Sequence, residues 1–428
     1  TAYSSIGLVW CGRMMRLWLV LTTLLTGARG QFNAVDYIIQ NFRFLPNVSF
    51  SAGDVSGRKH TFEKGSLKMD AQIFMASSSK FPVAFAIAHV VHTGVGNLSF
   101  DTKASEVFDW WTAEDARSTV TLRHLLTFTS GLVSSDFSSG GMQCLEGENA
   151  TEYDPEDCAR EIYSTAMKQP GAFWTTPGTQ WSYHSMHLQI AGAMAAKAAG
   201  LKVPAMLHKY LMKAVGMKKT FWLGDKNPHL AASMMTTGND YDKLLRAVLS
   251  YKVLPKEIVD QMETDAYRTY PGLRPSSYPK DVSLGFYGHY SMCTYFECVN
   301  QPWSSGCETA SIHADPGAFG YWPLINRQKE YYMNLVVFRP VTFNHTFMKK
   351  YHIAQDTLAA LPGHCVAPLR FGIQQFVEIG LHKHSGPEFT SAMLQEHGSV
   401  DDIAAKWYSK DGAPDPLDIL CKIATDET

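Results

Sequence analysis

Ser77 and Lys80 are the two residues of this sequence best suited to covalent chemistry. They stand three positions apart, so on a helix they share one face and their side chains can meet. A lysine whose charge is disfavoured by burial can accept the proton of a serine hydroxyl and so make it a nucleophile. The spacing alone is weak evidence, because it also occurs in two Gly- or Pro-bearing loops, at Ser56/Lys59 and Ser277/Lys280.

The residues that follow Ser77 predict a buried helix that would hold the pair in place. The apolar run from Phe81 to Val91 comes directly after Lys80, and Pro82 is tolerated only in the first turn of a helix. Neither of the other two Ser/Lys pairs has such a run behind it. Taken without further motifs, Ser77 would be an ordinary helix N-cap and Lys80 a solvated side chain.

Several other site patterns are absent from the sequence. It has no G-x-x-x-x-G-K-[ST] phosphate loop, no H-E-x-x-H zinc helix, no C-x-x-C pair and no G-x-S-x-G turn. The 16 histidines form no cluster with the spacing of metal ligands. We therefore expect no metal and no cofactor.

Acidic and basic residues nearly balance along the 428 residues. Lys and Arg number 38 against 40 Asp and Glu, a net charge of -2, and no basic tract is present. Binding of nucleic acid needs a clustered positive footprint, so we expect no nucleic-acid partner. With 45% hydrophobic and 18% charged residues, the composition is globular and excludes a disordered or fibrous protein.

The first thirty residues differ from the rest and resemble a secretory signal. Arg13 and Arg16 precede the apolar run from Leu17 to Leu25, and Ala28 and Gly30 supply the small residues of a cleavage site. We assign residues 1–30 to upstream residues plus a signal peptide and exclude them from the fold. The run is short for a bilayer span, so we expect no membrane contact after cleavage, with a short uncleaved anchor as the alternative.

The remaining sequence fits passage through an oxidising, glycosylating secretory pathway. Four N-x-[ST] sequons occur, at Asn47, Asn97, Asn149 and Asn344. Seven cysteines follow the signal segment, enough for up to three disulfides. The pairs we expect are Cys144 with Cys158, two among Cys293, Cys298 and Cys307, and Cys365 with Cys421. These features predict a secreted, or secretory-lumen, disulfide-bonded glycoprotein.

Hydrophobic periodicity predicts the elements that surround the Ser77 helix. A helix over 32–44 precedes strands within 48–64, and the stretch 120–220 is mainly helical apart from a surface loop at 134–158. The expected later elements are strands at 283–297 and 318–338 and a closing helix at 345–361.

Three segments read together resemble the serine β-lactamase family, meaning class C β-lactamases, D-alanyl-D-alanine carboxypeptidases and related esterases. Met75-Ala76-Ser77-Ser78-Ser79-Lys80 is similar to the nucleophile motif of that family. Thr121 to Leu132 resembles its helix-to-loop segment, and Pro177 to Ser185 resembles its second catalytic motif. The stretches Leu211 to Thr220 and Met234 to Leu249 follow in order, so the resemblance covers about residues 35–340 and is specific as a set.

This resemblance implies a fold and a mechanism. The fold would be an α/β (α+β) one of the β-lactamase/transpeptidase type, an antiparallel sheet flanked by helices with an inserted helical region. Ser77 would attack a carbonyl and become acylated, while Lys80 and Tyr183 would share the proton transfers. We accordingly expect a β-lactamase-related hydrolase domain over 31–362 and a C-terminal extension of unknown role over 363–428.

The third motif of the family, a triad ending in Gly, has two possible registers here. If His313-Ala314-Asp315 were the triad, the residue after it would be Pro316, which has no N–H for an oxyanion hole. If the triad is Asp315-Pro316-Gly317, the N–H of Ala318 can act with that of Ser77. We prefer the second register, and strand alternation leaves open whether His313 also faces the site.

Two departures from the family pattern bear on the substrate. Asp315 stands where the β-lactamases and carboxypeptidases hold a substrate carboxylate with a cationic or donor residue, and it would repel one. Ser185 replaces an Asn whose amide orients the substrate. With Ser185, His313, Asp315 and Gly317 as the substrate-binding set, we expect a neutral or cationic acyl group rather than a β-lactam.

The sequence therefore predicts a serine hydrolase, of esterase, amidase or peptidase type, that acts on a small-molecule or peptide acyl substrate. The alternative is a non-catalytic protein of the same fold that binds a ligand in a degenerate site. A third hypothesis adds a docking role for residues 363–428 on a macromolecular substrate. The oligomeric state stays open.

Overall fold

The structure is a computed structural model that carries side chains. It describes the chain over 32–42, 45–112, 114–133, 142–168, 174–274, 289–297 and 311–339, together with Cys307 and single positions between 366 and 381.

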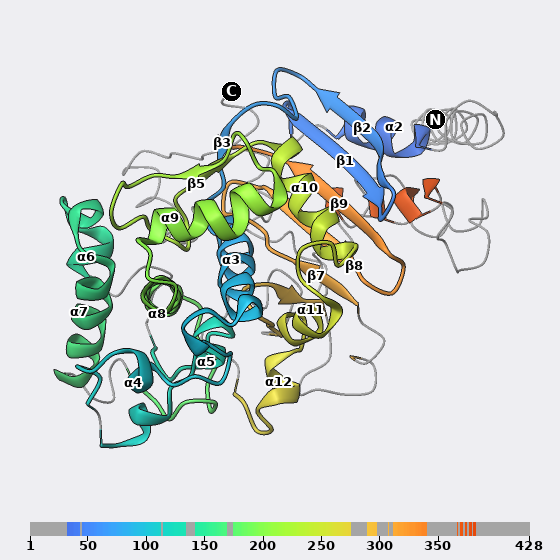
Figure 1. Ribbon diagram of the computed structural model, residues 1–428. Helices are drawn as coiled ribbons and strands as arrows, with labels where there is room; N and C mark the ends of the chain where they lie inside the picture. The colour runs from blue at the N-terminus through green and yellow to red at the C-terminus, as the bar shows by residue number, and fades with distance from the viewer. Residues whose placement is uncertain are drawn as a thin grey trace, which may run out of the picture.

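A six-stranded antiparallel sheet forms one side of the molecule (Figure 1). Its order is β2-β1-β9-β8-β7-β6, so the N-terminal hairpin pairs with a strand from late in the chain. Every residue of β8 and β9 is buried because helices cover the sheet, whereas β2 at the edge is exposed or only partly buried after its first residue. The strands are β1 (Val48–Asp54), β2 (Gly57–Lys64), β6 (Tyr295–Phe296), β7 (Ile312–Ala314), β8 (Trp322–Asn326) and β9 (Tyr331–Val336).

Two helices are buried almost all round and form the centre of the molecule. In α3 (Lys80–Thr93), Pro82 occupies the first turn, where its missing N–H costs no helical bond, and Gly94 ends the helix in a left-handed conformation. The second, α8 (Met186–Ala198), is buried from Met186 to Ala196 and packs beside α3. Helix α10 (Gly238–Leu249) lies across the sheet on β1, β8 and β9 (Figure 1).

The other helices gather on the side of α3 away from the N-terminal hairpin or at the margins of the sheet (Figure 1). The α-helices are α2 (Asn33–Asn41), α4 (Ala104–Val107), α5 (Leu122–Leu126), α6 (Gln143–Glu146), α7 (Pro155–Lys168), α9 (Val203–Leu207), α11 (Lys256–Met262) and α12 (Ala266–Thr269). The short η segments are η1 (Ala76–Ser79), η2 (Val95–Asn97), η3 (Ala116–Thr119), η4 (Ala150–Glu152) and η5 (His208–Lys213), of which η5 is a π-helix.

A second sheet of three short strands lies directly before the Ser77 segment. Its order is β3-β5-β4, and the chain passes from β3 into η1. The N–H of Met75 donates to the carbonyl oxygen of Met234 at 3.0 Å, which continues the pairing up to η1. The strands are β3 (Ile73–Phe74), β4 (Phe221–Trp222) and β5 (Met234–Thr236).

Most predicted elements that fall in the described residues are present. The expected helix at 32–44 is α2, the expected strands within 48–64 are β1 and β2, and the apolar run after Lys80 is α3. The expected strand at 318–338 is the β8–β9 hairpin, and β6 lies in 289–297, the described part of the other expected strand region. The closing helix predicted at 345–361 lies outside the described residues.

The predicted surface loop at 134–158 is wrong for its second half. Residues 142–158 contain α6, η4 and the start of α7, and Cys144, Leu145 and Cys158 are buried. The predicted disulfide between Cys144 and Cys158 is confirmed. Cys293 is a free buried thiol, and Cys307 is disulfide-bonded. The expected pair Cys365–Cys421 lies outside the described residues.

The hydrophobic core continues past the domain boundary that we predicted at 362. Val366, Leu369 and Ile373 are fully buried members of the main core cluster. The guanidinium of Arg370 pairs with the carboxylate of Glu297 at 2.6 Å, and Glu378 accepts a hydrogen bond from the hydroxyl of Tyr331 at 2.9 Å. The beginning of the C-terminal extension is therefore part of the domain.

No single helix among the described residues has the length and apolar character to span a membrane. One bent pair, α8 followed by α9 and η5, passes that test together, but a bend of 81° separates its halves and α8 is a buried core helix.

Candidate active site

Ser77 is the one solvent-accessible residue in an otherwise buried stretch. From Met75 to Ala88, all residues except Ser77 are buried. The backbone of Ala76 is left-handed, with φ 47°, so the chain turns sharply just before Ser77 enters η1. Strained backbone of this kind is often found at functional sites. The turn leaves Ser77 half-buried just before the start of α3.

Hydrogen bonds on both sides of η1 fix the position of this turn. The hydroxyl of Ser78 donates to the carbonyl oxygen of Asp315, and the hydroxyl of Tyr241 donates to the carbonyl oxygen of Ser78 at 3.0 Å. Ser79 Oγ donates to the carbonyl oxygen of Ala76 at 2.7 Å and accepts from the N–H of Met234 at 3.1 Å. Ser78 and Ser79 are therefore scaffold residues that orient Ser77.

Lys80 lies directly beneath Ser77 and contacts it. Its Nζ atom is 2.9 Å from the Oγ of Ser77 and also 2.9 Å from the carbonyl oxygen of Ala231. The side chain is buried, and this burial lowers the lysine pKa to about 8, although the negative charge of Asp315 acts in the opposite direction. A lysine with this pKa exchanges its proton easily near neutral pH, as a general base must.

Asp315 is buried beside Lys80 rather than open to solvent. Its carboxylate accepts a hydrogen bond from the N–H of Phe81 at 3.0 Å, at the start of α3. Burial raises the pKa of Asp315 to about 8, and the positive charge of Lys80 opposes the shift. We expected this side chain to line the substrate site and to repel a carboxylate there, but only 2% of the residue is exposed. The structure instead places it in the interior, beside the lysine.

Tyr183 forms the second neighbour of Lys80. The Nζ atom lies 4.7 Å from the centre of the Tyr183 ring, within the range of a cation–π contact. Four aromatic rings surround the tyrosine and fix its orientation, those of Phe128, Trp181, Tyr290 and Tyr295. Tyr183 is half-buried, so it shares with Ser77 the accessible side of the site.

The segment after β7 closes the site from the side of the large sheet. A Cβ atom on Gly317 would stand 2.4 Å from the carbonyl oxygen of Met75 and 3.0 Å from Ser78 Oγ, so only glycine fits here. The N–H of Gly317 donates to the carbonyl oxygen of Tyr321 at 2.8 Å, and the next residue, Ala318, lies in the turn before β8. The close contact of Gly317 with Met75 and Ser78 favours the Asp315-Pro316-Gly317 register.

His313 and Ser185 are less closely tied to Ser77. His313 is buried between Phe296, Ser291 Oγ at 3.4 Å and the carboxylate of Glu263 at 3.9 Å, and burial lowers its pKa. Among the described residues, the contacts of His313 are thus with residues other than Ser77, Lys80 and Tyr183. Ser185 is buried at the start of α8, two residues beyond Tyr183, and its hydroxyl does not cap that helix.

The segment 227–231 contributes two residues that the sequence did not identify. The carbonyl oxygen of Ala231 accepts a hydrogen bond from Lys80. His229 is half-buried, its Nδ1 atom has no partner among the described residues, and burial with the nearby charge of Lys80 lowers its pKa to about 4. A backbone carbonyl has no sequence signature, and a lone histidine in a loop gives no signal either.

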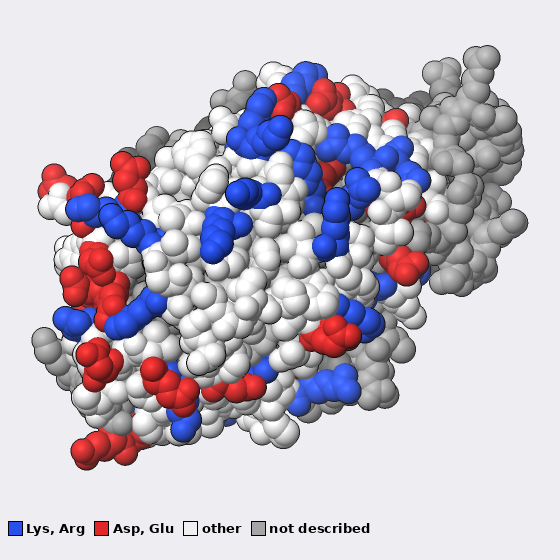
Figure 2. Space-filling view, viewed as in Figure 1, with Lys and Arg blue, Asp and Glu red and all other residues white. Residues whose placement is uncertain are grey.

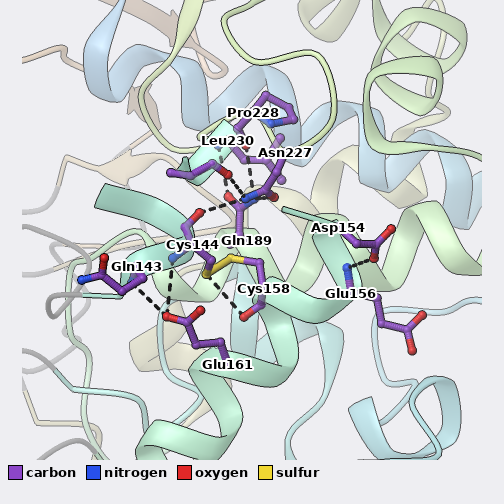
Figure 3. The surroundings of a disulfide bond; sticks show 11 residues. Gln143, Cys144, Asp154, Glu156, Cys158, Glu161, Gln189, Asn227, Pro228 and Leu230 are labelled. Carbon is purple, nitrogen blue, oxygen red and sulfur yellow. Dashed lines mark hydrogen bonds between the residues drawn. A yellow bond between two sulfur atoms is a disulfide. The ribbon is translucent and has the colours of Figure 1, made fainter. Parts of the chain in front are cut away.

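Buried amides fix this segment to the disulfide-bonded region (Figure 3). The side-chain amide of Asn227 donates to the carbonyl oxygens of Cys144 at 2.9 Å and Ala150 at 3.0 Å, and its Oδ1 accepts from Gln189 at 2.6 Å. Gln189 Oε1 in turn accepts from the N–H of Leu230 at 3.3 Å. The position of the lysine's acceptor therefore depends on α8 and on the Cys144–Cys158 bridge.

Within the described part of the chain, no group of three or more His, Cys, Asp or Glu side chains is arranged to hold a metal ion. The site consists of a serine, a lysine, a tyrosine and a buried carboxylate, a set suited to acyl transfer by the protein's own groups.

Comparison with solved structures places this arrangement in a known fold. A β-lactamase from Bacteroides dorei, described as putative, is 21% identical over 72% of this chain and 90% of its own, with a TM-score of 0.58. EstCE1, a hydrolase with promiscuous acyltransferase activity, is 12% identical over 80% of this chain and 98% of its own, with a TM-score of 0.57. Simvastatin synthase (LovD) from Aspergillus terreus is 16% identical over 79% of this chain and 98% of its own, with a TM-score of 0.52.

No curated protein matches the sequence significantly. The sequence model of the Beta-lactamase family matches residues 44–303, which include Ser77, Lys80, Tyr183 and the loop that carries Ala231. The predicted β-lactamase/transpeptidase-like fold, with its antiparallel sheet and helices, is confirmed. The chain belongs to the Beta-lactamase family.

Proposed function

We propose that this protein is a serine hydrolase that forms an acyl-enzyme on Ser77 and releases it to water. The observation that carries the proposal is the 2.9 Å contact between Lys80 Nζ and Ser77 Oγ, made by a lysine whose pKa is lowered to about 8. In a degenerate site nothing would require a buried amine against an accessible serine hydroxyl. Burial of an amine costs free energy, and buried amines with shifted pKa values are typical of active sites.

The proposed reaction has two halves. In the first, the neutral amine of Lys80 takes the proton of Ser77 while Oγ attacks the substrate carbonyl, and the leaving group departs as an alcohol or amine with that proton. In the second, water attacks the acyl-enzyme and gives a proton to the same base, which passes it to Oγ of Ser77 as the acyl group leaves as a carboxylic acid. Tyr183, adjacent to Lys80, is placed to share these transfers.

The oxyanion formed in each half needs donors that are already in position. We assign this role to the N–H groups of Ser77 and Ala318. Neither N–H donates a hydrogen bond to another described residue. Gly317 brings the Ala318 segment against the Ser77 turn, because its Cα lies in close contact with Met75.

The proposed substrate is an ester or amide with a neutral or cationic acyl group. The third motif supplies a buried carboxylate, Asp315, in place of a cation that would hold a substrate carboxylate. Ser185 lacks the amide that orients substrate in the β-lactamases. Both features argue against a dedicated β-lactamase, and they leave esters, amides and peptides.

We also propose that the protein acts outside the cytosol. The signal-like segment at 1–30 supports this, as does the Cys144–Cys158 disulfide, a bond that persists in oxidising compartments. Three of the four sequons, at Asn47, Asn97 and Asn149, lie on exposed residues, as glycosylation requires.

The test is hydrolysis of p-nitrophenyl butyrate by the purified protein and by Ser77→Ala. We expect the variant to lose at least about 1,000-fold in kcat/KM while keeping its melting temperature. A matched control is Ser56→Ala, which removes an exposed serine that also has a lysine three residues later. It should retain full activity.

A fluorophosphonate probe with mass spectrometry gives an independent readout. Labelling of Ser77 in the wild type and none in Ser77→Ala would support the acyl-enzyme. Equal low rates in all three proteins with no labelling would refute it and favour the alternative, a non-catalytic protein that binds a ligand in the same site.

A further inference from the structure

A hollow with positively charged walls lies between η5, α10 and the β1–β2 hairpin. Its cavity volume is about 440 Å³. Its charged lining comes from Arg58 of β2, Lys243 and Arg246 of α10, and Lys252 just after α10, with Asp242 as the single acid. None of the residues that line it belongs to the Ser77 site. It is therefore a separate feature of the surface.

Two of the four cations have acidic partners within the protein. Arg58 donates from Nε to Asp242 at 2.7 Å and from Nη2 to the side-chain oxygen of Asn239 at 2.7 Å. Lys243 pairs with Asp240 at 2.6 Å. These bonds fix the direction of both side chains, as in a preorganised site.

The other two cations are not neutralised. Across the described residues, neither Arg246 nor Lys252 forms an ion pair with an Asp or Glu; Arg246 makes only a long hydrogen bond of 3.4 Å from Nε to the carbonyl oxygen of Val55. Both side chains are exposed at the rim of the hollow. Two positive charges thus converge there without a counter-ion from the protein.

Asp242 does not neutralise the positive charges of Arg246 and Lys252. It is buried, and its oxygens already accept hydrogen bonds from Ser51, Arg58 and Asn334. Burial raises its pKa. Figure 2 shows the result on the surface, where Lys and Arg side chains gather over α10, η5 and the N-terminal hairpin while most acidic groups lie toward the margins.

The backbone beside the hollow has an uncommon conformation. η5 is a six-residue π-helix, and it leads directly into Ala214 and Val215, which line the hollow. The carbonyl oxygen of Gly216 accepts a hydrogen bond from Lys243 at 2.9 Å, which fixes that lysine to the end of the segment. π-Helical turns are rare and are found frequently at functional sites.

We propose that this hollow binds the phosphate group of a phosphate-bearing ligand. A phosphate monoester carries close to two negative charges at neutral pH, which matches the two cations left unpaired. The guanidinium group of Arg246 presents donors in the planar fork geometry that suits phosphate oxygens. The apolar side chains of Val215 and Val253 add a wall for a small organic group.

The experiment titrates phenyl phosphate into the full-length protein by isothermal titration calorimetry, with thermal shift as a second readout. We expect saturable binding of the wild type and about tenfold weaker binding for each of Arg246→Ala and Lys252→Ala, the loss expected when one charge-assisted contact is removed. The control is Lys202→Ala, an exposed lysine that does not line the hollow. It should bind as the wild type does.

Vesicles separate the two sources of a phosphate group. Sedimentation with phosphatidic acid vesicles, against phosphatidylcholine alone, tests a lipid headgroup, and phenyl phosphate tests a free ligand. Binding in either arm that is lost in Arg246→Ala supports the proposal and identifies the source. Absence of binding in both arms, or equal weakening by Lys202→Ala, overturns it. Ester hydrolysis should be unchanged in Arg246→Ala, which keeps this test independent of the Ser77 chemistry.

Discussion

The ammonium group of Lys80 donates a hydrogen bond to the carbonyl oxygen of Ala231 at 2.9 Å. The acceptor is neutral, so it orients the lysine without the full charge stabilisation that a carboxylate in contact would give. The lysine is consequently held against Ser77 in a state from which it can lose a proton. Ala231 thus acts as a positioning residue through its backbone alone.

Lys80→Arg separates the charge of this residue from its ability to act as a base. Arginine keeps the positive charge but cannot deprotonate in a protein, so we expect ester hydrolysis to fall by about 100- to 10,000-fold. Lys80→Met, which keeps the length without the charge, should be equally inactive but well folded, because burial then costs nothing. Steady-state rates and melting temperatures check both variants. Activity above a tenth of wild type in Lys80→Arg would remove the general-base role.

The rate should depend on pH through the same lysine. Its neutral form is the active one, so kcat/KM should rise with pH and level off above a midpoint near the lysine pKa of about 8. The charge of Asp315 raises that pKa, so Asp315→Asn should move the midpoint to lower pH. Asp70→Asn, an exposed aspartate paired with Lys219, is the control and should leave it in place. A midpoint that moved upward in Asp315→Asn would contradict the assignment.

Gly317→Ala tests the contact that brings the third motif to Ser77. The new methyl group would stand 2.4 Å from the Met75 carbonyl oxygen, so the strand end or the serine turn must shift. We expect a loss of about 1–3 kcal/mol in the free energy of unfolding and a large fall in kcat. Gly200→Ala is the comparison: its Cβ would meet nothing within 4 Å, although φ is +63°. Gly200→Ala should lower the free energy of unfolding by about 1 kcal/mol and leave kcat unchanged.

Removal of the Cys144–Cys158 bridge should lower stability and disturb the site. The bond closes a loop with a sequence separation of 14. The chain entropy that such a bond removes from the unfolded state predicts a stabilisation of about 3 kcal/mol. Because Asn227 donates to the Cys144 carbonyl, we expect Cys144→Ala/Cys158→Ala also to reduce kcat. Urea unfolding and steady-state kinetics measure the two effects. Full activity in a destabilised variant would show that the loop at 227–231 is held without the bridge.

The sequence predicted the contact between Ser77 and Lys80 better than the surroundings of that contact. Ser77 and Lys80 could be paired because a helix brings residues three apart together, and η1 running into α3 has that geometry. His313 and Asp315 could not be assigned by strand alternation, because β7 ends at Ala314 and the two side chains enter different environments. The helices of 142–158 were missed since α6 and η4 are each one turn long, too short to show a period.

The pairing of β1 with β9 has a consequence for the synthesis of the chain. Ser49 and Val336 are register partners in the sheet, 287 residues apart. At about 5–20 residues per second, a ribosome needs roughly 15 to 60 s to pass from one strand to the other. During that interval the β1–β2 hairpin exists with one unpaired edge and with Phe50 and Ala52 uncovered. The nascent protein should therefore depend on chaperone protection until its last sheet strand emerges.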